Sequence, residues 1–387
     1  MKKIAILGLH NDRNMGDPLI CQTVMKLYES CVEEVVLWKK VDLRFYHSHF
    51  LDLYKDSFMK YLIIATNKFF SWFARWDIAF VHNLRIIYLS YEMDKLVKGS
   101  DKAIIAGGGI VHYIFHDYYA GICSFILACQ RNNIPVIINA VGIEGFDNNS
   151  SKCKMFSKYL RNPIVKFVST RDNINILKNY YLKKYNTIPV IKVPDPVLLC
   201  SKVFPINIAS SNTIGIGIIR ENVFDDYKVD AKPDLLCNYY CGLAYELEKR
   251  GLEYEFFING LKKDLSLLRS IEKKLNRKIK VRIPNNVHDF LSIITSYRGI
   301  ITARMHSCIV AYSYNLPAIA FNWNDKLPMW FMNINRPDCC FELSELDPSM
   351  VIDKFLELES NGYDIGLRTY LENAYLDSLK TAIRLTG

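Results

Sequence analysis

The stretch from Gly299 to Trp330 constrains the fold most, because it has the pattern of a complete β–α–β unit. An apolar strand, Gly299–Ala303, leads into a small-residue helix, Ser307–Tyr314, and then into a second apolar strand, Ala318–Phe321. The strands are followed by three basic or titratable side chains, Arg304, His306 and Lys326. Ligands of open α/β sheets bind at the carboxyl ends of the strands, so this unit predicts an anion site beside a proton-transfer group.

The rest of the chain repeats the strand–loop–helix pattern, which predicts doubly wound parallel sheets. A chain of 387 residues, half of them apolar, is long enough for two cores. We expect an N-terminal Rossmann-like domain over residues 1–205, with an aromatic-rich helical insertion at about 45–98. A second such domain is expected over 213–345, and closing helices over 346–387.

Charge and cysteine content exclude several classes of protein. The net charge of +9 favours anionic partners, but the basic residues are dispersed and form no nucleic-acid motif, so we expect no nucleic-acid partner. The eleven cysteines lack metal-site spacing and the carboxylates form no cage, so no metal is expected. Cysteines in apolar surroundings indicate a reducing compartment, and the start MKKIAILGL is typical of a first strand, which together favour the cytoplasm.

Two loops of the first domain directly follow strands and are candidates for ligand binding. The first, His10–Pro18, contains Asn14 and Asp17, which either bind a ligand or serve as turn and helix-cap residues. The second is Gly107–Gly109, where glycine permits positive φ angles and close approach of a ligand to the backbone. His112 follows it, as a ligand contact or as a structural histidine.

The insertion has two interpretations. Its segment LYKDSFMKYLIIATNKFFSWFARW has apolar residues at near-helical spacing, which is typical of helices that pack on a core. The alternative is a peripheral helix that contacts an anionic membrane through about residues 53–76, with aromatic and basic residues on opposite faces.

In the second domain, two further strands end in polar residues. Arg220 follows the apolar strand Thr213–Ile219, and Asn259 follows Tyr254–Ile258. We therefore expect Arg220, Arg304 and Lys326 to form one cationic edge.

Seven short motifs in order resemble the polysaccharide pyruvyl transferase family. They are N-M-G-D (Asn14–Asp17), G-G-G (Gly107–Gly109), S-T-R-D (Ser169–Asp172), D-P (Asp195–Pro196), N-G with a later D (Asn259, Gly260, Asp264), R-M-H-S (Arg304–Ser307) and D-K (Asp325–Lys326). The resemblance implies two Rossmann-like domains facing across a cleft, as in GT-B glycosyltransferases. It also implies that phosphoenolpyruvate is the co-substrate, with no other cofactor, and that a pyruvate ketal is placed on a sugar.

On this reading we assign the site residues to three roles. Donor binding is assigned to Arg220, Asn259, Arg304, His306 and Lys326. Catalysis is assigned to Asp17, Arg304, His306 and Lys326, with His306 moving protons. Acceptor binding is assigned to Asn14, Asp17, Gly107, Gly108, Gly109 and His112.

Two other functions remain open at this point. One is a GT-B glycosyltransferase that uses a nucleotide sugar, since a fold does not fix a function. The other is a non-catalytic glycan-binding protein. Whether the acceptor is lipid-linked, which would place the protein at the inner face of the membrane, is also left open.

Overall fold

The computed structural model describes residues 1–45, 57–74, 76–113, 117–183, 187–208, 211–220, 223–224 and 234–387. These residues divide into two compact units. Unit 1 contains residues 1–12, 20–196 and 373–387, and unit 2 contains residues 13–19 and 197–372. Each unit is built on its own parallel sheet, which confirms the predicted α/β class.

Unit 1 has a six-stranded sheet in the order β2-β1-β3-β5-β7-β8. Its strands are β1 (Lys2–Gly8), β2 (Val36–Asp42), β3 (Lys102–Ala106), β5 (Val136–Val141), β7 (Val165–Thr170) and β8 (Val190–Lys192). The central strands are continuous apolar runs because helices cover both faces of a parallel sheet. A separate two-stranded sheet joins β4 (Val111–His112) to β6 (Ile143–Glu144).

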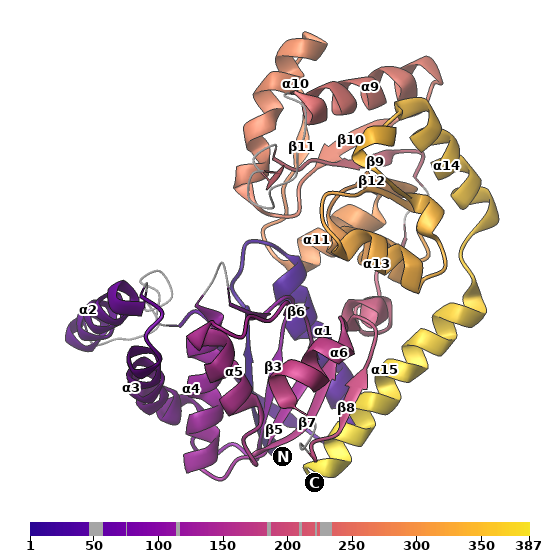
Figure 1. The fold of residues 1–387 in the computed structure, drawn as a ribbon. Coiled ribbons are helices and arrows are strands. Elements are labelled where there is room, and N and C mark those ends of the chain that lie inside the picture. The colour runs from indigo at the N-terminus through magenta and orange to yellow at the C-terminus, as the bar shows by residue number, and fades with distance from the viewer. Residues whose placement is uncertain are drawn as a thin grey trace. The chain divides into compact units, whose positions relative to one another are not determined.

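The helices of unit 1 include a group that belongs to the predicted insertion. They are α1 (Gly16–Val32, its first turn in unit 2), α2 (Ser57–Ala74), α3 (Ala79–Val97), α4 (Tyr118–Arg131), α5 (Ser151–Leu160), α6 (Ile174–Ile176) and the π-helical turn Leu177–Leu182. Helix α3 packs against α4 and α5, and α2 lies on the outer side of α3 (Figure 1).

Unit 2 has the strand order β11-β10-β9-β12-β13-β14, which is the Rossmann order 3-2-1-4-5-6. Its strands are β9 (Ile214–Gly217), β10 (Tyr254–Phe257), β11 (Val281–Arg282), β12 (Gly299–Thr302), β13 (Ala318–Phe321) and β14 (Cys340–Phe341). Its helices are α7 (Cys200–Val203), α9 (Leu235–Lys249), α10 (Leu268–Leu275), α11 (Val287–Thr295), α12 (Met305–Ser313), α13 (Lys326–Asn333), α14 (Pro348–Asn361) and α15 (Ile365–Leu385, ending in unit 1). Short 3₁₀ turns lie at Pro196–Leu199, Lys262–Leu267, Pro337–Cys339 and Leu343–Glu345.

The unit boundaries differ from the predicted domain boundaries of 1–205 and 213–345. Residues 13–19 belong to unit 2 because Asn259 binds them, through its carbonyl to the Met15 N–H (3.0 Å) and through its side chain to Asn14 (2.6 Å). The end of α15 belongs to unit 1, where the Tyr375 hydroxyl donates to Asn139 (2.6 Å). The closing helices therefore do not form a separate segment.

The insertion is helical, as predicted. The membrane alternative placed aromatic and basic residues on opposite faces, and this feature of it is wrong, because Lys68 is exposed together with Phe69 and Trp72. The opposite face is occupied by Ile63 and Asn67, which are buried. Residues 53–56 and 75 of the predicted membrane segment lie outside the described residues.

Candidate active site

The carboxyl edge of the sheet in unit 2 gathers the predicted donor-site residues. Four neighbouring strands, β10, β9, β12 and β13, run parallel and each leads into one or two of them. Asn259 follows β10, Arg220 follows β9, Arg304 and His306 follow β12, and Lys326 follows β13. The strand order reverses between β9 and β12, so Arg220 and Arg304 flank the position where Rossmann-like sheets bind ligands.

Arg304 is held by the carboxylate of Asp264, a residue that belongs to one of the motifs but was given no role by sequence reasoning. The Nη2 atom of Arg304 donates to both carboxylate oxygens of Asp264, whose side chain is 0% exposed. Asp264 also accepts a hydrogen bond from the backbone N–H of Arg220 (3.3 Å). The buried Nε of Arg304 has no hydrogen-bond acceptor among the residues that the structure describes. Asp264 thus fixes one side of the guanidinium, and a further N–H remains for an anionic oxygen.

Asn259 joins the segment 13–19 to α12. Its Nδ2 donates to the Asn14 Oδ1 (2.6 Å), and its Oδ1 accepts from the Ser307 hydroxyl (3.2 Å). Asn14 in turn donates to the Asp17 carboxylate (3.2 Å). Both residues were expected in the N-terminal domain, opposite the donor side, but they lie in unit 2, hydrogen-bonded directly or through each other to Asn259 of the predicted donor site. Their assignment to the acceptor stays a prediction.

Gly260 permits this docking. It has a φ of +98°, and a Cβ at this position would lie 2.2 Å from the carbonyl oxygen of Arg13. Only glycine meets both requirements without displacing the backbone. The N-G pair of the motif therefore has a structural explanation, since Asn259 binds residues 13–19 and Gly260 makes space for them.

His306 lies in the first turn of α12, where 8% of the residue is exposed. Its ring is packed against Gly16, since a Cβ on Gly16 would lie 2.2 Å from the His306 Nδ1 and 2.4 Å from its Cγ. Asp17 is the next residue along α1. The structure thus brings a carboxylate-bearing helix start beside the imidazole of His306.

Gly16→Ala should destabilise the protein by about 1–3 kcal/mol and lower activity, because the new methyl group must displace the His306 ring. An alanine near a helix start without such a clash is neutral or stabilising. Gly366→Ala is the matched control, because its Cβ would meet only the Asp364 Oδ1, at 3.3 Å. Urea unfolding and steady-state kinetics test both variants. Wild-type stability and activity in Gly16→Ala would show that the ring is not confined by this glycine.

Lys326 begins α13, and the loop before it is fixed to the neighbouring strand. The indole N–H of Trp323 donates to the carbonyl of Ala303 (2.7 Å), which follows β12. The Asn324 Oδ1 accepts from the backbone N–H of Lys326 (3.0 Å). These bonds tie the loop after β13 to the loop after β12, so Lys326 and Arg304 are presented by connected segments. Sequence reasoning missed Trp323, whose position two residues after the apolar strand was the available signal.

In unit 1, the predicted acceptor residues also lie at the carboxyl edge of a sheet. His112 Nε2 lies 2.7 Å from the Glu144 Oε2, in the small sheet that pairs β4 with β6, and the His112 side chain is 5% exposed. Sequence reasoning did not pair these two residues, which are far apart in the chain. The histidine is thus held by a carboxylate, an arrangement that orients imidazoles in proton-transfer sites.

One of the two predicted reasons for the three glycines, a positive φ angle, is wrong, and the close approach of a ligand stays a prediction. None of Gly107, Gly108 and Gly109 has a positive φ. The carbonyl of Gly108 accepts from the N–H of Gly142 (2.7 Å) and of Ile110 (2.9 Å), so this turn is shaped by close contact with the loop after β5. A Cβ on Gly142 would lie 2.9 Å from both the Gly108 carbonyl oxygen and the Gly109 Cα. Small residues are required here for backbone packing.

Two other histidines of unit 1 make structural contacts. Burial lowers the pKa of His10 to about 4, and its Nε2 lies 3.1 Å from the carbonyl oxygen of Ile6. Burial also lowers the pKa of His82, whose Nδ1 lies 2.7 Å from the Tyr119 hydroxyl. Arg171 is paired with the buried Asp195, which is the structural alternative considered for this arginine.

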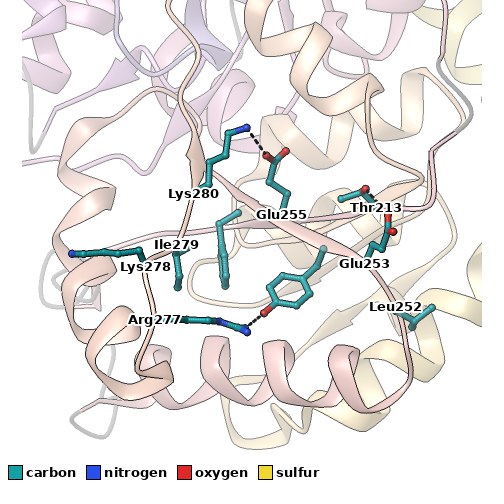
Figure 2. A pocket seen from close by; sticks show the side chains of 10 residues that line it. Thr213, Leu252, Glu253, Glu255, Arg277, Lys278, Ile279 and Lys280 are labelled. Atoms are coloured by element: carbon teal, nitrogen blue, oxygen red, sulfur yellow. Dashed lines mark hydrogen bonds and ion pairs between the residues drawn. The ribbon is translucent and has the colours of Figure 1, made fainter.

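A groove of about 540 Å³ lies away from these residues, at the amino end of β9 and β10. Figure 2 shows Lys280 directed toward Glu255. Arg277 donates a hydrogen bond to the Tyr254 hydroxyl. The Lys280 Nζ lies 3.9 Å from the Glu255 carboxylate, and Arg277 also pairs with Glu248. Because its cations are already paired and the ligand edge is opposite, we do not assign the active site to this groove. No cluster of three metal-binding side chains occurs within the described ranges.

Comparisons with known proteins agree with this architecture. The family model described as polysaccharide pyruvyl transferase matches residues 14–325. No curated protein matches the chain in sequence. Solved structures with a similar fold include UDP-GlcNAc 2-epimerase from Methanocaldococcus jannaschii (14% identity, TM-score 0.54, 93% of each chain covered). Another is the Neisseria meningitidis enzyme bound to UDP-GlcNAc (13% identity, TM-score 0.51, 99% of this chain and 100% of that chain). At this identity the likeness extends to the two-domain, GT-B-like fold alone.

Proposed function

Because the chain belongs to the polysaccharide pyruvyl transferase family, we propose that it transfers pyruvate from phosphoenolpyruvate to a sugar of a cell-surface polysaccharide or its precursor. The product is a pyruvate ketal, and phosphate is released. One observation supports the proposal: three neighbouring parallel strands, β9, β12 and β13, lead into Arg220, Arg304, His306 and Lys326 at one edge of the sheet in unit 2.

The charges at this edge suit a small ligand with two anionic groups. Phosphoenolpyruvate carries a phosphate and a carboxylate, and arginine side chains bind both with paired hydrogen bonds. The buried Asp264 carboxylate pairs with Arg304 and holds its guanidinium at this edge. The Arg304 Nε, buried and without an acceptor in the described chain, supports an anionic oxygen at this position. In the complex, Lys326 stabilises the departing phosphate.

We assign the proton transfers to His306 and to His112, whose imidazole is held by the Glu144 carboxylate. A proton is delivered to C3 of the donor, and a sugar hydroxyl attacks C2 and loses its own proton. The C–O bond to phosphate then breaks, and a second hydroxyl closes the ketal as its proton leaves with the phosphate. His306, beside the α1 start that carries Asp17, exchanges protons with the donor. In unit 1, the His112–Glu144 pair and the Gly107–Gly109 turn bind the acceptor.

Phosphoenolpyruvate should raise the melting temperature more than UDP- or GDP-sugars, with or without EDTA. A ligand at about 100 times its Kd stabilises the native state by about 2.7 kcal/mol, provided that it does not bind the unfolded chain. Lys326→Ala should reduce this shift, whereas Lys278→Ala, whose side chain lies in the groove at the other end of the sheet, should not. Stabilisation by a nucleotide sugar and none by phosphoenolpyruvate would instead support a glycosyltransferase. A shift that EDTA abolishes would show that a metal takes part.

A further inference from the structure

Helix α2 and the start of α3 present an unusually apolar surface to solvent. We call this surface the aromatic face; it consists of Tyr61, Leu62, Phe69, Trp72, Trp76, Ile78, Phe80 and Leu84. The exposed fractions are 68% for Tyr61, 59% for Phe69, 55% for Trp72 and 69% for both Trp76 and Phe80. Contiguous exposed apolar patches of this kind mark sites of interaction with a protein or a membrane.

The aromatic face is an outward face of α2, opposite the residues that pack on the rest of unit 1. Tyr61, Phe69 and Trp72 recur at helical spacing on the exposed side, whereas Ile63 and Asn67 are buried on the other. Figure 1 shows α2 on the side of α3 that is remote from α4. A helix that is apolar on both sides is normally buried on both sides. The exposed outward side of α2 therefore indicates an interaction surface.

A buried polar network fixes this helix pair to unit 1. At the α2–α3 junction, the Asp77 carboxylate accepts from the Ser151 N–H (2.8 Å) and contacts the His82 Nε2 (2.9 Å). On α3, the fully buried Arg85 donates to Asn67 of α2 (3.0 Å) and to Asp117 before α4 (2.9 Å). The aromatic face is therefore held outward by hydrogen bonds.

The network also locates the aromatic face relative to the sheet of unit 1. Asp117 and Ser151 stand at the starts of α4 and α5, which follow β3 and β5 along the chain. Helices that follow parallel strands begin at the carboxyl edge, so the α2–α3 junction lies at the edge that also holds the His112–Glu144 pair.

We propose that the aromatic face docks on the surface of an anionic lipid bilayer. Between residues 57 and 84, which span the aromatic face, the sequence carries three basic residues, Lys60, Lys68 and Arg75, and one acidic residue, Asp77, which contacts Ser151 and His82. Tryptophan and tyrosine favour the membrane–water interface, and nearby basic side chains attract anionic headgroups. No helix in the described part of the chain is long and apolar enough to cross a membrane. In the proposed docking, α2 lies in the plane of the membrane surface.

Docking has a consequence for the acceptor, and this consequence rests on the proposed function. A bilayer against the aromatic face would lie next to the carboxyl edge of unit 1. A sugar linked to a membrane lipid could reach the His112–Glu144 pair from there without leaving the bilayer. The acceptor class that fits this geometry is therefore a lipid-linked saccharide.

Sedimentation with vesicles tests the docking. The protein should pellet with phosphatidylcholine vesicles that contain phosphatidylglycerol, less with phosphatidylcholine alone, and less at high salt because the basic contribution is screened. Trp72→Ser/Phe80→Ser should lower the partition coefficient at least about tenfold, because two apolar side chains no longer insert. Tyr245→Ser/Tyr370→Ser, which removes two exposed aromatic rings from unit 2, is the matched control and should bind normally.

Two outcomes would overturn the proposal. One is the absence of wild-type binding to anionic vesicles at every salt concentration. The other is equal vesicle binding by Trp72→Ser/Phe80→Ser and the wild type. If this variant also loses a dimer that light scattering detects in the wild type, the aromatic face is a contact between copies. The thermal shift by phosphoenolpyruvate is measured on the same samples. A normal shift without vesicle binding refutes the docking alone, and vesicle binding without a shift refutes the proposed donor alone.

Discussion

Replacing His306 with alanine should lower kcat by about 10²–10⁴-fold, which is the usual contribution of a positioned acid or base. The imidazole sits in the first turn of α12 against Gly16, among the cations that we assign to the donor. The truncated variant should remain folded, because the ring lies in a polar setting at the sheet edge and its loss opens no large apolar cavity. His306→Gln should retain part of the donor binding through its amide but remain slow.

Steady-state kinetics and a melting curve for each variant test this assignment. His288→Ala is the matched control, since this exposed histidine of α11 belongs to the same unit but follows the edge strand β11, outside the β9–β12 position assigned to the donor. We expect wild-type kcat for the control. If His306→Ala is folded and retains near-wild-type kcat, the proton-transfer role belongs to another group, with Lys326 and Asp17 the first to test.

Arg304→Ala should destabilise the protein by about 3–5 kcal/mol, because it leaves the fully buried Asp264 carboxylate without its ion-pair partner. The sequence alone predicts a folded variant, since no apolar cavity is created, and Asp264 is the reason to revise that expectation. Adding Asp264→Asn should recover much of the lost stability, because the buried charge is removed with its partner. The amide oxygen can still accept from the Arg220 N–H.

Urea unfolding of the two single variants and the double variant measures this coupling. Because the double variant should be folded, it separates the effect on stability from the effect on donor binding. Its KM for phosphoenolpyruvate should be raised, because the guanidinium that we assign to the anion is absent. Arg304→Ala with wild-type stability, and no gain on adding Asp264→Asn, would show that the ion pair contributes nothing. A wild-type KM in the double variant would remove Arg304 from the donor site.

The strands of the active edge could be predicted from sequence because they are short apolar runs with polar ends. The strand expected at Gly299–Ala303 is β12 (Gly299–Thr302), and the one expected at Ala318–Phe321 has those bounds in the structure. Their parallel order explains why residues scattered from Arg220 to Lys326 reach one edge. The local pattern was sufficient here because each side chain directly follows its own strand.

The membership of residues 13–19 in unit 2 could not be predicted in the same way. It depends on the hydrogen bonds of Asn259 with the Asn14 side chain, 245 positions away, and with the Met15 N–H. The Arg304–Asp264 and His112–Glu144 pairs also join loops that follow different strands. Local patterns carry no information on such pairings, although the motifs N-M-G-D and N-G with its later aspartate contained Asn14, Asn259 and Asp264.

The orientation of α2 could not be predicted from the sequence, for a different reason. Its apolar residues occur on both sides of the helix, so periodicity could not show which side packs inward. In the structure, the side that carries Asn67 packs inward, because Asn67 accepts a hydrogen bond from the buried Arg85. A buried arginine with amide and carboxylate partners is rare enough that sequence reasoning would place it on the surface.

The most direct test of the central claim is turnover with phosphoenolpyruvate. The protein is incubated with this donor and with lipid-linked or nitrophenyl sugars, and phosphate release and product mass are followed together. We predict one phosphate released per product, and a product heavier than the acceptor by one pyruvate less one water, neither of which should form with His306→Ala. Sugar transfer from a nucleotide sugar, without any mass gain from phosphoenolpyruvate, would contradict the proposed function.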